Sequence, residues 1–120
     1  MQLPPIVESA KARPLSYDPR TDEFIYYNDV QKGKKKIYPL EKLTREQLLK
    51  LAIERQLTNV PSTTAVLQSQ TYTNEQVAEE MRAQTKFGKQ MFEADIDYLK
   101  FYLSQFPPEA FENIDSPATS

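Results

Sequence analysis

Hydrophobic and polar positions follow two different periods along this chain, first one typical of strands and then one typical of helices. Within residues 15–40, short β-rich runs alternate with turn residues. This pattern predicts a short antiparallel meander with a second strand over residues 24–27 and a third over residues 36–40. Proline donates no hydrogen bond to a ladder, so Pro39 confines the third strand to an edge or an end.

Two stretches with the same spacing predict the starts of helices. Thr44 and Gln47 match a capping box, in which a hydroxyl and an amide side chain satisfy two backbone N–H groups. Thr73 and Gln76 repeat this spacing. After the first box, apolar positions at threes and fours over residues 45–57 predict an amphipathic helix that packs on the sheet.

The second box opens a helical pattern that runs without proline over residues 74–106. One unbroken helix of these 33 residues would be about 50 Å long at 1.5 Å per residue, longer than a small domain can cover with its own core. Part of its apolar face would then contact a partner. The alternative is a break near Thr85 to Gly88, after which residues 89–106 fold back as a further helix. Both alternatives remain open at the level of sequence.

The connection between the two helical patterns, residues 58–71, is rich in hydroxyl and amide side chains and contains Pro61. Its length of about 14 residues exceeds that of most loops, and long ordered loops are often binding elements. We expect an irregular connection with a short strand or turn at residues 65–67.

The two ends of the chain lack either period. Residues 1–14 hold three prolines, so we expect an extended arm. Residues 107–120 form a polar tail in which Phe111 and Ile114 are candidate anchors. The sequence therefore predicts the α+β class, with a single small domain over residues 15–106 between two arms.

The chain contains neither cysteine nor histidine. It therefore lacks the side chain that titrates near neutral pH and the commonest zinc ligands, which removes most hydrolase and metalloenzyme arrangements. Among the carboxylates of "FEADIDYLK", Glu93 and Asp97 share a helix face, while Asp95 lies about 200° from Glu93 around the helix axis. Three metal ligands do not converge there. We predict a non-catalytic protein without a cofactor or a bound metal.

Apolar runs in this sequence stay far below the roughly 20 residues that a membrane-spanning helix needs. The opening stretch, "MQLPPIVESAKARP", also lacks a charged lead followed by an apolar segment. On these two grounds we expect a soluble protein that stays in the cytoplasm.

The net charge of −2 conceals an asymmetry between the two halves of the chain. Residues 1–60 carry 11 basic and 8 acidic side chains, whereas residues 61–120 carry 4 and 9. Such a split indicates one basic and one acidic surface, although the overall balance argues against a dedicated nucleic-acid-binding domain.

The stretch "KGKKKIYP" carries the densest charge in the sequence. Its lysines, together with two neighbouring tyrosines, are candidates for binding an anionic partner: Lys32, Lys34, Lys35, Lys36, Tyr27 and Tyr38. Ammonium groups can neutralise phosphates while aromatic rings stack on unpaired bases. The structural alternative is that the lysines blunt a sheet edge and the tyrosines pack half-buried on the sheet. The cluster holds no arginine, the residue that best recognises base edges.

The stretch "LTREQLLKLAIERQL", residues 43–57, is similar to the opening helix of the small helix-extension-helix modules of the SAP type, which bind DNA. The resemblance covers about 15 residues, and the next helical pattern follows a long connection instead of a short one. It implies a further argument for nucleic-acid binding.

Methionine and aromatic side chains recur along residues 74–106 and form the main candidate partner-binding face: Met81, Met91, Phe92, Leu99, Tyr102 and Phe106. Such side chains are favoured at interfaces, but they also suit an ordinary core. We expect an assembly or accessory subunit that binds another protein or a second copy of itself through this face and the terminal arms. A nucleic-acid-binding accessory protein that uses the lysine cluster is the alternative.

Overall fold

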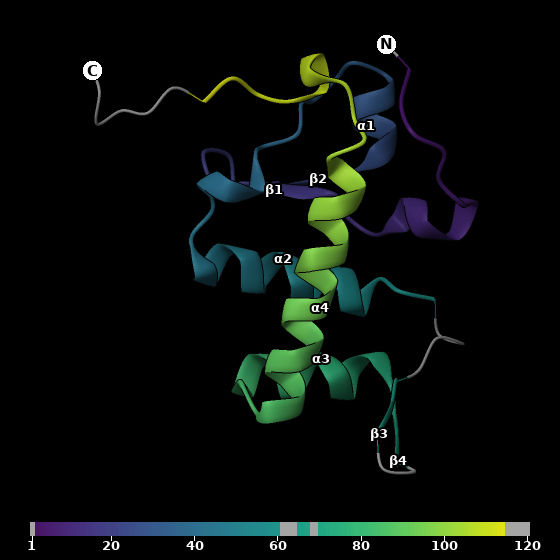
Figure 1. The fold of residues 1–120 in the computed structure, drawn as a ribbon, viewed down its shortest axis with the longest axis vertical. Helices are drawn as coiled ribbons and strands as arrows, with labels where there is room; N and C mark the ends of the chain where they lie inside the picture. The colour runs from purple at the N-terminus through teal and green to yellow at the C-terminus, as the bar shows by residue number, and fades with distance from the viewer. Residues whose placement is uncertain (1, 61–64, 68–69, 115–120) are drawn as a thin grey trace.

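The computed structural model describes residues 2–60, 65–67 and 70–114 and shows an α+β fold, which confirms the predicted class (Figure 1). The described residues form four α-helices, two short antiparallel hairpins and three 3-10 helices. In chain order these elements are η1 (Glu8–Ala12), β1 (Ser16–Asp18), β2 (Glu23–Ile25), α1 (Tyr27–Gln31), η2 (Leu40–Lys42), α2 (Arg45–Leu57), β3 (Ala65–Leu67), β4 (Gln70–Tyr72), α3 (Asn74–Ala83), α4 (Lys86–Leu103) and η3 (Pro108–Ala110).

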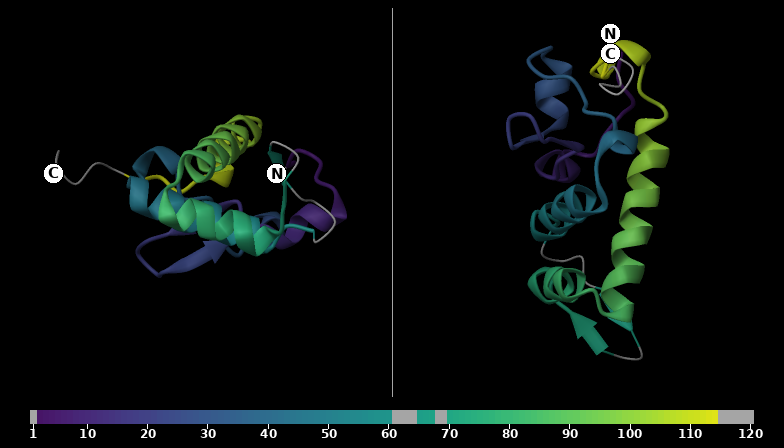
Figure 2. Two further views of the ribbon diagram at one scale, coloured as in Figure 1. Left: turned by 90° about the horizontal axis from the view of Figure 1, so that it is seen from below. Right: turned by 90° about the vertical axis from the view of Figure 1, so that its left-hand side faces the viewer.

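Helix α4 runs along the long axis of the molecule, which measures 48 × 34 × 22 Å (Figure 1). Helices α1, α2 and α3 are stacked along one side of α4 (Figure 2). The β1–β2 hairpin contacts α2, and the β3–β4 hairpin lies beside α3 at one end of the molecule (Figure 1). Helix α4 therefore lies alongside the three other α-helices (Figure 2).

Strands β1 and β2 pair antiparallel, with Tyr17 opposite Phe24, as the sequence pattern predicts. The predicted third strand at residues 36–40 is wrong, because only Ile37 forms a bridge there, and its partner is Phe111 in a parallel arrangement. The backbone of this segment is used elsewhere: Ser16 Oγ donates a hydrogen bond of 2.6 Å to the carbonyl oxygen of Tyr38.

Strand β2 ends at Ile25, two residues earlier than predicted, and helix α1 begins at Tyr27. Tyr27 and Val30 are three residues apart and both buried, so one turn of helix turns both side chains inward. An acidic residue, Asp29, lies in the first turn, where it interacts favourably with the helix dipole. Burial of this pair explains why a helix replaces the expected turn.

The helical pattern over residues 74–106 is broken near Thr85, as one of the two alternatives predicts, and the break consists of Gln84 and Thr85. Helix α3 ends at Gln84, whose φ of 55° and ψ of 41° are left-handed, and Thr85 caps α4 by accepting a hydrogen bond of 3.0 Å from Gly88 N. Gly88 itself lies inside the first turn of α4, buried against α3. The glycine therefore permits close helix packing and does not end a helix.

The two capping boxes predicted from the sequence are confirmed. Thr73 Oγ1 accepts from Gln76 N at 3.1 Å, and Gln76 Oε1 accepts from Thr73 N at 2.8 Å. Thr44 and Gln47 make the same pair of hydrogen bonds at the start of α2. Each box satisfies two backbone donors that the helix cannot satisfy by itself.

We expect Thr73→Ala to lower the free energy of unfolding by about 1 kcal/mol, since it removes the acceptor for a first-turn N–H group. The measurement is urea denaturation followed by circular dichroism. Thr21→Ala is the control, because Thr21 is exposed and its side chain makes no hydrogen bond to the residues that the structure describes. Equal stability of both variants would contradict the role of the capping box.

The core consists of two adjacent clusters of buried side chains. One cluster lies between α2, α3 and the first half of α4: Ala52, Val77, Met81, Phe92 and Ile96. The larger cluster combines β1, β2, α1 and α2 with the second half of α4, and its members extend from Leu15 to Ala110. Within the described part of the chain, no helix is both long and apolar enough to cross a membrane.

Both terminal arms are attached to the larger cluster, and neither is wholly extended. The N-terminal arm contains η1, and two tyrosine hydroxyls hold its backbone: Tyr27 Oη donates to the carbonyl oxygen of Pro4 at 2.7 Å and Tyr102 Oη to that of Pro5 at 3.1 Å. In the C-terminal arm, Phe111 and Ile114 pack against the cluster as predicted. The tail beyond residue 114 lies outside the described residues.

Candidate functional site

The predicted partner-binding face on residues 74–106 is mostly part of the protein's own core. Met81, Phe92, Leu99 and Phe106 are buried, and Met91 is partly buried against the smaller cluster. The break at Gln84 folds α4 back on α3, so both helices cover each other's apolar faces. This arrangement corrects the expectation that these side chains are presented to a partner.

Helix α4 instead exposes two other aromatic side chains. Tyr98 is 59% exposed and Phe101 is 67% exposed. Tyr102, the remaining member of the predicted face, is half-buried, and its ring lies parallel to that of Tyr98 with the centroids 6.5 Å apart. The exposed rings on α4 are therefore those of Tyr98 and Phe101, whereas the predicted Phe92 is buried.

The lysine cluster follows α1 and forms a well-defined loop, residues 32–36, which we call the basic loop. Gly33 allows the sharp turn through its φ of 73°. The backbone N–H groups of Lys34 and Lys35 both donate to the carbonyl oxygen of Asp29, at 2.9 and 3.3 Å. These hydrogen bonds fix the backbone of the loop, while the lysine side chains extend from it.

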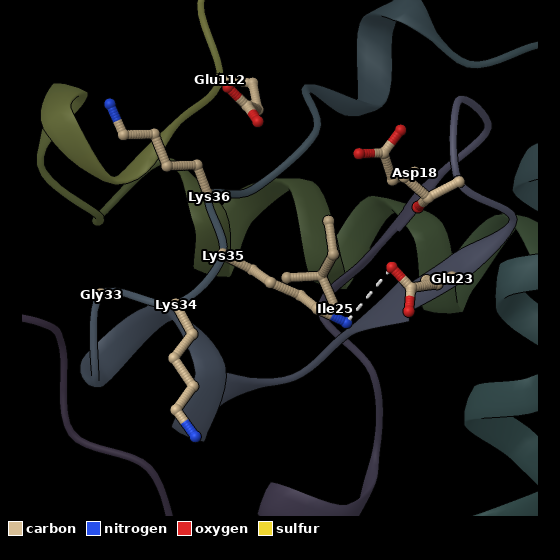
Figure 3. A pocket seen from close by; sticks show the side chains of 9 residues that line it. Asp18, Glu23, Ile25, Gly33, Lys34, Lys35, Lys36 and Glu112 are labelled. Atoms are coloured by element: carbon tan, nitrogen blue, oxygen red, sulfur yellow. Dashed lines mark ion pairs between the residues drawn. The ribbon is translucent and has the colours of Figure 1, made fainter.

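The basic loop forms one wall of a groove of about 470 Å³ (Figure 3). Three lysines, Lys34 to Lys36, line it on one side. Carboxylates of the β1–β2 hairpin lie across from them, and Glu112 of the C-terminal arm lies beside Lys36. The other lining residues are Asp18, Thr21, Glu23, Ile25, Gly33 and Glu112. The groove thus joins three segments that are far apart in the sequence.

The carboxylates of this groove already have cationic partners. Arg20 Nη2 lies 2.9 Å from Asp18 and 2.9 Å from Glu112. Lys35 Nζ lies 3.7 Å from Glu23 (Figure 3). The hydrogen bonds from the Arg20 side chain lower the pKa of Asp18, and those to Asp18 and Glu112 raise the pKa of Arg20.

Three lysines of the basic loop remain available. Lys32, Lys34 and Lys36 are exposed and form no ion pair with any residue in the described ranges. The lysine ammonium of Lys35, by contrast, points toward Glu23 across the groove (Figure 3). The surface of the basic loop therefore carries an excess of positive charge next to the groove.

The two tyrosines selected with the lysine cluster are not available for stacking. Tyr27 and Tyr38 are both buried in the larger core cluster. The guanidinium group of Arg20 lies over the Tyr38 ring, with its carbon 5.4 Å from the ring centroid. This corrects the hypothesis that these rings stack on bases beside the basic loop.

Sequence reasoning missed Arg20 and Glu112 as members of the groove. Arg20 follows the predicted turn after β1, where a charged residue is unremarkable. Glu112 reaches the groove only because Ile37 pairs with the C-terminal arm, a contact between distant segments that no local pattern encodes. Among the residues that the structure describes, no group of three or more acidic side chains could hold a metal ion.

Comparison with known proteins gives no further assignment. The chain matches no family model, no curated protein and no solved structure.

Proposed function

We propose that this protein is a non-catalytic interaction subunit that binds an acidic segment of a partner protein in the groove beside the basic loop. The observation that carries this proposal is the set of three exposed lysines without ion pairs on the basic loop, of which Lys34 and Lys36 line a groove whose own carboxylates are already paired. An incoming carboxylate would find ammonium groups that no internal partner occupies.

The protein's own C-terminal arm supports this mode of binding. Ile37 N donates to the carbonyl oxygen of Ala110 at 2.8 Å, and Glu112 N donates to that of Ile37 at 2.9 Å. The Glu112 carboxylate then reaches Arg20. An extended, acidic segment therefore already pairs directly beside the basic loop, through the backbone and side-chain contacts that strand addition by a partner uses.

A protein partner suits this groove better than the nucleic-acid alternative. A peptide can pair through its backbone as well as through its side chains, as residues 110–112 do with Ile37. Single-stranded nucleic acid requires aromatic surfaces, and Tyr27 and Tyr38 are buried. The lack of histidine and cysteine in the chain supports a non-catalytic role.

Charge reversal at the basic loop tests the proposal. We expect the triple variant Lys32→Glu, Lys34→Glu and Lys36→Glu to bind a fluorescein-labelled, glutamate-rich peptide at least about tenfold more weakly, since exposed ion pairs contribute about 0.2 to 1 kcal/mol each and repulsion replaces them. Fluorescence anisotropy over a salt series measures this. The matched control is Lys42→Glu, Lys86→Glu and Lys89→Glu, which makes the same change in net charge at exposed positions outside the groove.

The same experiment separates the two candidate partners. A single-stranded oligonucleotide of equal charge is expected to bind more weakly than the peptide, and tighter oligonucleotide binding would favour the nucleic-acid alternative. Equal losses in the two triple variants would overturn the groove as the binding site. Light scattering after gel filtration shows whether a second copy is the partner, in which case the reversal at the basic loop dissociates the oligomer.

A further inference from the structure

A second cavity, of about 190 Å³, lies between the N-terminal arm and helix α4 on a different part of the surface from the groove. Its walls are largely apolar and aromatic, with Pro5, Ile6 and Val7 on the arm and Tyr98 and Tyr102 on α4. Two arginines, Arg13 and Arg55, also line it, together with Ala10 and Leu15. An apolar cavity with a few converging polar groups is the usual form of a small-molecule site.

The two arginines share a single carboxylate. Arg55 Nε and Nη2 donate to the two oxygens of Asp95 at 2.9 and 3.1 Å, and Arg13 Nη2 donates to Asp95 Oδ1 at 3.2 Å. The three side chains are only 4%, 15% and 20% exposed for Arg55, Asp95 and Arg13. One positive charge is therefore left over in a largely dry environment, where an additional anion interacts strongly.

Hydrogen-bond donors at this cavity also remain free. Arg13 uses Nε for the carbonyl oxygen of Arg55 and Nη2 for Asp95, so within the described residues its Nη1 group donates to nothing. The hydroxyl of Tyr98 likewise makes no hydrogen bond to the part of the chain that the structure describes. A planar carboxylate is the ligand group that best matches a guanidinium edge.

The electrostatics of Arg13 point the same way. Burial, followed by the positive charge of Arg55, lowers the pKa of Arg13, while Asp95 acts in the opposite direction. Tyr102 at the cavity wall stays a neutral donor, because burial raises its pKa to about 12. The lowered pKa of Arg13 therefore reflects its burial and the imbalance between two guanidiniums and one carboxylate.

We infer that this cavity binds a small carboxylate with a short apolar body, the carboxylate pairing with Arg13 and Tyr98 and the body packing between the N-terminal arm and helix α4. The carboxylate of the ligand and that of Asp95 would together balance the positive charges of Arg13 and Arg55. The cavity volume lies below the roughly 300 to 1,000 Å³ of sites for drug-sized molecules, so the ligand is restricted to about the size of one aromatic ring. This inference is independent of the function proposed for the groove.

The test compares benzoate with benzamide on the full chain, because the two probes share their shape and differ in charge. Isothermal titration calorimetry measures affinity, and the Arg Nε–H resonances in nuclear magnetic resonance spectra report the site. We expect benzoate to bind and to shift the Arg13 and Arg55 resonances, with benzamide at least about tenfold weaker. Equal binding of both probes, or no binding of either, would overturn the inference.

The source of the carboxylate is distinguished by a second pair of probes, N-acetylphenylalanine and its amide. A free small acid is indicated when benzoate binds more tightly than N-acetylphenylalanine, and the carboxyl terminus of a peptide when the order is reversed. Both results support a carboxylate site, whereas binding of the amide as tightly as the acid would contradict it.

Two variants locate the site. We expect Tyr98→Ala to weaken benzoate binding severalfold, because it removes a wall and a donor, while Phe101→Ala on the same helix leaves binding unchanged. Arg13→Gln removes the surplus charge but keeps the Arg55–Asp95 pair, and it should abolish the difference between benzoate and benzamide. Equal weakening by Tyr98→Ala and Phe101→Ala would place any binding elsewhere and overturn the inference, even if Arg13→Gln fails to fold.

Discussion

Gly88→Ala is expected to destabilise the protein by at least about 3 kcal/mol, at the upper end of the usual cost of overpacking. A Cβ atom at this position would overlap the backbone carbonyl of Glu80 and lie 2.7 Å from Met81 N. Backbone atoms of α3 cannot rotate away as a side chain can, so α3 and α4 would have to separate. Urea denaturation monitored by circular dichroism measures the change.

The sign of this effect is opposite to what helix propensity alone predicts, since alanine is about 1 kcal/mol more favourable than glycine inside a helix. A more stable Gly88→Ala variant would therefore show that α3 and α4 do not approach each other as described. Gly33→Ala is the control: its φ of 73° is strained for alanine, but no atom lies within 4 Å of the new Cβ. We expect a loss of about 1 kcal/mol there.

The second large effect is expected for Asp95→Asn, which leaves the guanidiniums of Arg13 and Arg55 without a counter-charge. Removal of one partner from a buried ion pair costs about 3 to 5 kcal/mol, because the other charge stays buried and unpaired. Against a typical stability of about 5 to 15 kcal/mol, this is a large share. Thermal and urea denaturation at neutral pH provide the measurement.

Asp97→Asn is the matched control for Asp95→Asn. Asp97 is exposed on the same helix and forms no ion pair with the described residues, so its replacement should change stability by less than about 0.5 kcal/mol. Similar losses in the two variants would mean that the arginine cluster contributes little. In the double variant Arg13→Gln with Asp95→Asn, we expect the loss to be smaller than the sum of the single losses, because Asp95→Asn then leaves one guanidinium unpaired instead of two.

Local chemistry in the sequence predicts the starts of α2 and α3, and distant contacts determine much of the rest of the fold. The capping boxes at Thr44 and Thr73 involve residues three positions apart, so they can be recognised without any knowledge of tertiary structure. The prediction of a third strand was wrong because Ile37 pairs with the C-terminal arm, which lies more than 70 residues further along the chain. Helix α1 was missed because five residues are too few to show a helical period.

The two predicted sites had different outcomes, because one depends on local charge and the other on burial by distant segments. The charge of Lys32 to Lys36 is a local property, and these lysines do line or flank a groove. Burial is not local: the stripe that contains Met81 and Phe92 could face either a partner or another helix, and the left-handed residue Gln84 decides for the latter. The sequence holds no signal that Arg13, Arg55 and Asp95 meet, since they come from three separate segments.

The composition of the larger core cluster has a consequence for the order of events during synthesis. This cluster joins Leu15 near one end of the chain to Leu99, Phe106 and Ala110 near the other. A nascent chain that has left the ribosome only as far as α2 therefore exposes apolar side chains whose packing partners have not yet been made. The larger cluster can therefore pack stably only after α4 and residues 104–110 have emerged, because these segments supply the side chains that cover the earlier ones.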